Sequence, residues 1–146
     1  MDSIYAVGDV LQGAPELTPT AVMSGVHIAH KIYQKLNKKF PKKIKNLDFT
    51  NHPTTVFSYP EYSMCGLSEE EAVAKHGEDN IEVWHSITTP LEQELITDKF
   101  PDGSDKKIKS YFKLVCLRDK ESTILGMHYL GQHAGEVMQG YAVYSY

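Results

Sequence analysis

The pattern of apolar and polar residues opens with a short apolar run at residues 3–7. The run stops at Gly8 and Asp9, which is typical of a buried parallel strand. Parallel neighbours are joined by crossover connections of about a dozen residues or more, and the chain before this strand is far shorter than that. We therefore expect most of its sheet to lie outside this chain, and a fold that is truncated at both ends.

The next periodic segment predicts a helix from Thr18 to about Leu36, because apolar residues recur there at helical spacing. Thr18 is a suitable N-cap and Pro19 suits the first helical position. Residues 1–37 are thus expected to be the C-terminal remnant of an α/β domain. Residues 38–51, rich in Lys and Asn and without sustained periodicity, are expected to be a linker.

Residues 52–146 predict a second, α+β domain. Residues 53–58 are β-branched and aromatic, which favours a strand. Ser68 and Glu71 have the spacing of a capping box, which predicts the start of a short helix that Gly77 ends.

Later segments of this domain predict a sheet. Residues 81–87 alternate as a strand does, and residues 88–109 carry prolines and charges that indicate a long surface excursion. Residues 111–117 and 123–130 flank a polar turn and are expected to form an antiparallel hairpin. A last helix is expected from Ala134.

Composition places the chain among globular proteins. Its 146 residues are 41% hydrophobic and 23% charged, which excludes disorder. No run of about 18 apolar residues exists, so no membrane helix is expected. The start of the chain lacks a secretory signal, so the cytoplasm is the expected compartment, with mitochondria as an alternative if a targeting segment precedes it.

Charge and cysteine usage exclude two further classes of site. The net charge of −4 gives nucleic-acid binding no support, and the lysines between Lys31 and Lys45 fit a solvated helix end better than a phosphate site. Cys65 and Cys116 stand far apart, so we expect buried free thiols and neither a metal site nor a redox pair.

Several blocks of the chain resemble one enzyme family. Residues 3–9 and 16–19 resemble the flavin-contacting strand and helix start of the FAD-dependent pyridine nucleotide-disulfide oxidoreductases, which include thioredoxin and glutathione reductases. Residues 53–57, 66–72 and 126–140 resemble pieces of the dimerisation domain of that family. The resemblance implies an FAD-binding remnant, the linker, and a dimerisation domain that is incomplete at its C-terminus.

The resemblance also implies which residues contact the cofactor FAD. Asp9 matches the residue that hydrogen-bonds a ribityl hydroxyl, and Gly8 lets the backbone approach the cofactor. Glu16, Leu17 and Thr18 match residues beside the flavin ring, where the start of the following helix offers unpaired N–H groups. Without a ligand, the same segment is an ordinary strand, loop and capped helix.

The family's reactive parts are missing from this sequence. There is no G-x-G-x-x-G phosphate cradle for FAD or NADPH, no redox-active cysteine pair and no C-terminal His-Pro segment. The seven His residues are expected to be ordinary surface or core residues. No catalytic residue is therefore expected here, and the chain alone should not reduce disulfides.

The implied whole protein is a thioredoxin-disulfide reductase that moves electrons from NADPH through FAD to a protein disulfide. Residues 64–73 and 80–86 are most similar to the animal-type enzymes of high molecular weight. A glutathione reductase or related enzyme is one alternative, because the residues that choose the substrate lie outside this chain. A flavin-free dimerisation or interaction module is another.

The resemblance implies a homodimer, since the dimerisation domain of the family packs against a second subunit. The last helix is expected to present an apolar face to that partner or to its own core. The residues expected on this face are Val137, Tyr141 and Tyr144.

Overall fold

A computed structural model describes residues 4–36, 46–47, 49, 51–119 and 121–143. The chain divides into two compact units, residues 1–50 and residues 51–146. We describe each unit by itself.

The described part of unit 1 contains a short 3-10 helix, η1 (Gly8–Val10), packed beside α1 (Thr18–Leu36). The helix predicted from Thr18 to Leu36 is confirmed, although Thr18 is its first residue and the Leu17 carbonyl accepts the N–H of Ala21. The strand predicted at residues 3–7 is wrong for its described part, because Ile4–Val7 form no strand. A parallel strand needs neighbours, and the described part of unit 1 holds no other strand.

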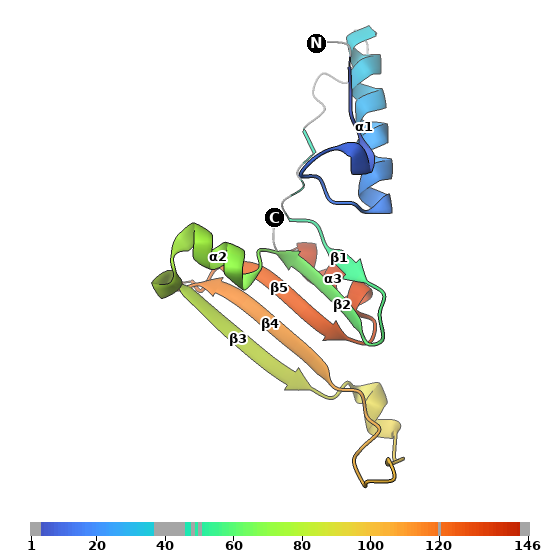
Figure 1. Cartoon of the computed structure of the whole chain (residues 1–146), viewed down its shortest axis with the longest axis vertical. Coiled ribbons are helices and arrows are strands. Elements are labelled where there is room, and N and C mark those ends of the chain that lie inside the picture. Colours follow the sequence, from blue (N-terminus) through green and yellow to red (C-terminus); the bar gives the residue numbers. More distant parts are fainter. Residues whose placement is uncertain (1–3, 37–45, 48, 50, 120, 144–146) are drawn as a thin grey trace. The chain divides into compact units, whose positions relative to one another are not determined.

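Unit 2 is built on a five-stranded antiparallel sheet in the order β1-β2-β5-β4-β3. Helices accompany this sheet, so the predicted α+β class is confirmed (Figure 1). The strands are β1 (Thr54–Val56), β2 (Glu61–Gly66), β3 (Ile81–Thr88), β4 (Ser110–Leu117) and β5 (Ile124–Gly131).

The sequence patterns missed β2, which lies between β1 and β5. Its side chains alternate, with Ser63 and Cys65 buried and their neighbours half-buried. The Ser63 hydroxyl lies 2.9 Å from Thr55 Oγ1 and donates to the Thr54 carbonyl at 2.9 Å, which ties β1 to β2. Because several of its side chains are small or polar, β2 contains no apolar run that would predict a strand.

Each face of the sheet has its own core and its own helix. On one face, Cys65 of β2 and Met127 of β5 pack with Met138 of α3 (Ala134–Ala142). On the other face, Ile81 and Val115 pack with Ala72 of α2. The two helices therefore cover opposite faces of the sheet (Figure 1).

The capping box of α2 (Glu69–His76) is present as predicted. The Ser68 hydroxyl accepts the N–H of Glu71 at 3.2 Å, and the Glu71 carboxylate accepts the N–H of Ser68 at 2.9 Å. Gly77 ends the helix at a φ of 85°. The box fixes the first turn of α2 beside the open part of the sheet.

The predicted hairpin of residues 111–117 and 123–130 is confirmed as β4 and β5. Asp119 in its turn accepts the backbone N–H groups of Glu121 and Thr123, each at 3.1 Å, and the Thr123 hydroxyl at 2.9 Å. The turn is thus built around one carboxylate.

The excursion predicted between β3 and β4 is also present, and it includes the short 3-10 helix η3 (Leu91–Leu95). Gln93 is buried at its base, although its neighbours Leu91 and Leu95 are more than four-fifths exposed. The Gln93 side chain accepts the N–H of Ile108 at 2.9 Å and donates to Gln132 Oε1 at 2.6 Å. This one amide joins the two ends of the excursion to the end of β5.

Helix α3 begins at Ala134 as predicted, and its buried face is formed by residues other than Val137 and Tyr141. Ala134, Met138 and Ala142 point into the core, while Tyr141 is 43% exposed. The Tyr141 ring still lies 5.4 Å from the Phe112 ring, so it packs within the unit. Tyr144 lies outside the described residues.

Candidate functional site

The part of the sheet that α2 leaves uncovered carries two parallel rows of side chains. In the first row, the strand register places His85, Lys113 and His128 side by side on β3, β4 and β5. The second row lies two residues further along each strand and contains Ile87, Tyr111 and Leu130. Because strand side chains alternate, both rows share one face. A polar row therefore lies next to an apolar one.

His128 is buried in the polar row and both of its ring nitrogens are engaged. Nε2 lies 3.2 Å from the Leu67 carbonyl, and Nδ1 lies 2.8 Å from the Tyr62 hydroxyl. A carbonyl only accepts, so in the neutral ring Nε2 carries the proton and Nδ1 accepts from Tyr62. Burial raises the pKa of the Tyr62 phenol, with a smaller opposing effect of Lys113. The hydrogen-bonded Tyr62 and His128 thus line this site with a neutral phenol and a neutral imidazole.

Lys113 in the centre of the polar row forms an ion pair with the first turn of α2. Its Nζ lies 2.7 Å from Glu69 Oε2, and both side chains remain partly exposed. The neighbouring Glu70 is exposed, and its pKa is lowered chiefly by a hydrogen bond to its own backbone N–H and then by Ser68. One ammonium thus faces a pair of carboxylates at this helix end.

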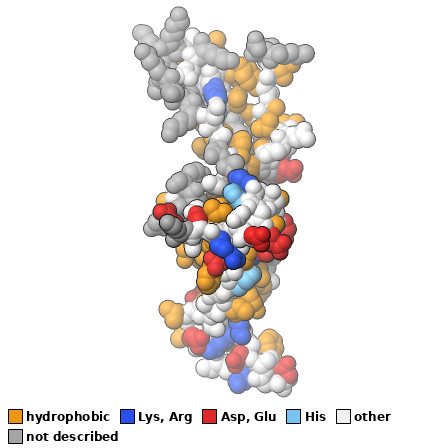
Figure 2. Space-filling view, turned by 90° about the vertical axis from the view of Figure 1, so that its left-hand side faces the viewer, with side chains coloured by type: hydrophobic (Ala, Val, Ile, Leu, Met, Phe, Trp, Pro, Cys, Tyr) orange, Lys and Arg blue, Asp and Glu red, His pale blue; other side chains and the backbone are white. Residues whose placement is uncertain are grey.

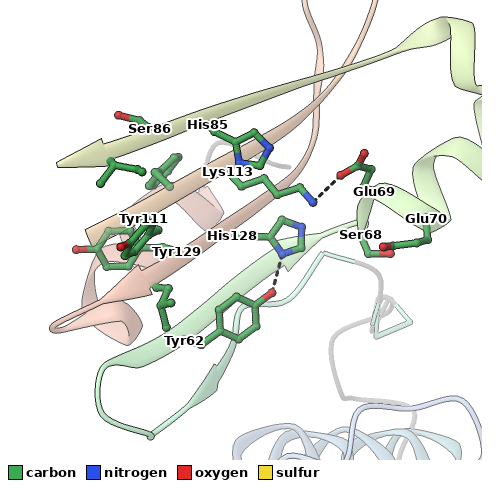
Figure 3. Close-up of a pocket in the computed structure, with 13 residues that line it drawn as sticks. Tyr62, Ser68, Glu69, Glu70, His85, Ser86, Tyr111, Lys113, His128 and Tyr129 are labelled. Carbon is green, nitrogen blue, oxygen red and sulfur yellow. Dashed lines mark hydrogen bonds and ion pairs between the residues drawn. The ribbon is translucent and has the colours of Figure 1, made fainter. Parts of the chain in front are cut away.

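These rows and the start of α2 enclose a cavity of about 490 Å³, which we call the sheet groove. Figure 3 shows Lys113 reaching toward Glu69 while Tyr62 and His128 point toward each other. A cavity of this size is typical of a small-molecule site. The groove is lined by Tyr62, Ser68, Glu69, Glu70, His85, Ser86, Ile87, Tyr111, Phe112, Lys113, His128, Tyr129 and Leu130.

Acidic side chains mark the α2 side of the groove. The first turn of α2 contributes Glu69 and Glu70 to the lining of the groove. Figure 2 shows acidic side chains gathered on this side of unit 2. Lys113 thus lies between these two carboxylates and the apolar row.

Of the residues expected to contact flavin, Gly8 and Asp9 lie against the first turns of α1. Gly8 has a φ of 71°, and its N–H donates to the Ser24 hydroxyl at 3.1 Å. A Cβ at Gly8 would lie 3.4 Å from Cβ of Ala21, so the backbone runs close to the helix. The Asp9 side chain is exposed. A carboxylate in this position fits a ligand hydroxyl, and its role stays a prediction.

Glu16, Leu17 and Thr18 occupy the loop end and first residue of α1. Glu16 and Thr18 are exposed and Leu17 is half-buried, so this end of the helix is open to a ligand. The first N–H groups of a helix have no partner within it, and they attract negative charge. The resemblance implies that these residues lie beside a flavin ring, and this assignment also stays a prediction.

Both cysteines are buried thiols, as expected, and neither is part of a disulfide. Burial raises the pKa of the Cys116 thiol, and the nearby carboxylates of Glu82 and Asp119 add to this effect. The described residues contain no group of three or more side chains suited to a metal ion. No helix among them has both the length and the apolar character needed to cross a membrane.

The sequence analysis missed the sheet groove. It assigned the His residues ordinary roles, and it had no strand at residues 61–66, so Tyr62 had no place on the sheet. Once β2 is known, its pairing sets Met64 opposite His128, and Tyr62 lies on the same face. The detectable signal was the Lys113 and His128 pair at matching positions of the predicted hairpin.

Comparison with known proteins gives two results. Residues 52–145 match the dimerisation domain of the pyridine nucleotide-disulphide oxidoreductases. The chain is 39% identical to thioredoxin reductase SEP1 of Emiliania huxleyi over 148 aligned residues, which cover 96% of this chain and 27% of that protein. The chain thus spans about a quarter of the length of this curated relative.

Proposed function

Because this chain belongs to the pyridine nucleotide-disulphide oxidoreductase family, we propose that it is part of a flavin-dependent thioredoxin-disulfide reductase. The observation that carries the proposal is the 39% identity to a thioredoxin reductase over nearly the whole chain, unit 1 included. In the proposed enzyme, unit 2 forms the subunit contact of a homodimer and unit 1 supplies part of the flavin site. NADPH is the electron donor and a protein disulfide the acceptor.

Unit 1 would hold FAD through Gly8, Asp9 and the start of α1. Glycine suits this position because its φ is positive and a Cβ there would lie against Ala21, so the backbone can turn close to α1 before Asp9. The exposed Asp9 carboxylate would accept a hydrogen bond from a ribityl hydroxyl, while Thr18 and Glu16 would lie beside the ring. Bound FAD supplies the electron transfer between NADPH and the disulfide.

The subtype is a finer part of the proposal. Residues 64–73 and 80–86 resemble the animal-type thioredoxin reductases. Both segments belong to regular elements of unit 2: the first contains the end of β2 and the start of α2, and the second contains most of β3. We propose this subtype over glutathione reductase on the strength of these segments and the curated relative.

The test is to express the complete open reading frame that contains these residues and to compare it with the chain alone. The complete protein should show flavin absorbance and should reduce thioredoxin with NADPH far faster than glutathione disulfide. Preference for glutathione disulfide would replace the proposal by the glutathione reductase alternative. A colourless, inactive dimer from the complete frame would favour an interaction module instead. The chain alone should be inactive in each case.

A further inference from the structure

Two side chains of the apolar row of the sheet groove are exposed to solvent. Ile87 is 61% exposed and Tyr111 is 46% exposed, and the register places them side by side with Leu130 next to Tyr111. Together they form a strip on one face of three adjacent strands. Covering such a strip with an apolar body removes it from water, which is favourable.

The polar row offers hydrogen-bond donors at one side of this strip. An ammonium has three N–H groups, and Lys113 uses one of them for Glu69 at 2.7 Å. His85 is exposed and lies directly opposite Lys113 on β3. Tyr62 and His128 are hydrogen-bonded to each other, so they form part of the groove wall. The N–H groups available to a ligand therefore come from Lys113 and His85.

The positions of the charges decide which head group fits. Glu69 and Glu70 belong to α2, while Lys113 and His85 stand two residues from Tyr111 and Ile87 on their own strands. A ligand lying on the apolar strip therefore meets Lys113 and His85 before it meets the carboxylates. A negatively charged acceptor at this place would share the Lys113 ammonium with Glu69, whereas a ligand ammonium would meet Lys113 before it reached the two carboxylates.

From this arrangement we propose that the sheet groove binds a small carboxylate carried on a flat apolar body, such as an aromatic acid. The carboxylate accepts hydrogen bonds from Lys113 and His85, and the ring system covers Ile87, Tyr111 and Leu130. The cavity of about 490 Å³ accommodates a body of two fused rings. The proposal does not rest on flavin binding or on the subunit contact.

The test uses 2-naphthoate as the probe and follows the backbone amides of the labelled chain by NMR during titration. The signals of Tyr111, Lys113 and His85 should shift with saturation. The neutral analogue 2-naphthylmethanol should bind about tenfold more weakly, because it lacks the charge-assisted hydrogen bonds. Shifts confined to other parts of the chain, or tighter binding of the alcohol or of 2-naphthylmethylamine, would overturn the proposal.

Two charge variants give effects of opposite sign. Lys113→Gln should weaken naphthoate binding about tenfold, whereas Glu69→Gln should strengthen it several-fold by releasing the ammonium. Both variants lose the same ion pair, so a purely structural role of that pair would move both affinities in the same direction and would contradict the proposal. His85→Gln, at an exposed position, should weaken binding without changing the circular dichroism spectrum.

Discussion

The Tyr62 hydroxyl lies 2.8 Å from Nδ1 of His128, and their rings stack with an angle of 19° between the planes. The pair joins β2 to β5 on the face opposite α3. His128 is only 9% exposed and its other nitrogen contacts the Leu67 carbonyl, so the imidazole is satisfied only when Tyr62 is present.

Tyr62→Phe should lower the free energy of unfolding by about 1–2 kcal/mol, because it leaves the buried Nδ1 without this hydrogen bond. Urea denaturation followed by circular dichroism measures the change. Tyr59→Phe, at a position 80% exposed, is the matched control and should change stability little. Equal stability of the two variants would show that the pair contributes nothing.

Gly126→Ala should destabilise unit 2 by about 3 kcal/mol or more. A Cβ at this buried position would run into the backbone of Leu67, which the N–H of Leu67 holds in place by donating to the Leu125 carbonyl at 2.9 Å. In Gly140→Ala the new Cβ meets nothing within 4 Å. That helical control should be neutral or slightly stabilising in thermal melts.

Asp119 should make the fold sensitive to acid. Hydrogen bonds from the Thr123 N–H and hydroxyl, and then from Glu121, lower the pKa of this carboxyl below its usual value. A lowered folded-state pKa stabilises the fold above the unfolded pKa of about 4, and this contribution is lost as the pH falls through the folded-state value.

Asp119→Ala should therefore lower the urea midpoint at pH 7, and it should remove part of the fall in stability between about pH 5 and pH 2. Asp79→Ala, at another exposed carboxylate, serves as the control and should keep the acid dependence of the original chain. An unchanged acid dependence in Asp119→Ala would contradict the role assigned to this turn.

Substitutions at the buried and the exposed positions of helix α3 test folding and association separately. Met138 is fully buried, so Met138→Ala should cost about 2–5 kcal/mol of folding stability. Val143 is 71% exposed at the end of the helix, so Val143→Glu should leave the melting temperature nearly unchanged.

In the proposed homodimer, Val143→Glu should weaken association, and sedimentation measures this. Tyr141→Glu is a less selective probe, because the Tyr141 ring also packs on Phe112. A folded wild-type chain that stays monomeric throughout the micromolar range would exclude association through unit 2 alone.

Asp9→Ala in the complete enzyme should weaken FAD binding by about 1–3 kcal/mol, because one ribityl hydroxyl loses its acceptor. Flavin release on dilution, followed by absorbance, measures the loss. Asp79→Ala is again the control, since Asp79 belongs to unit 2. Equal flavin retention in both variants would remove Asp9 from the proposed site.

Sequence patterns predicted those elements whose signals are local. The capping box of Ser68 and Glu71, the hairpin around Asp119 and the periodicity of α1 all depend on residues close in sequence. Such signals are visible because the interacting groups are a few residues apart.

The groove was hidden because its contacts join distant segments. Tyr62 and His128 are 66 residues apart in the sequence, and Lys113 and Glu69 are also distant in it. The buried face of α3 was not predicted for the same reason. Met138 packs on Cys65 of β2, and β2 was not predicted because it contains no run of apolar residues.

The buried amide of Gln93 lies between the sheet and the tip of the β3–β4 excursion, and it holds the base of the excursion in place. Since Ile108 and Gln132 are hydrogen-bonded to this one side chain, we expect β3 and β4 to keep their register when residues at positions 97–105 are changed. That stretch is exposed apart from its local contacts. A peptide tag or fluorophore inserted there should leave the fold intact, which makes the excursion a practical handle for labelling the protein.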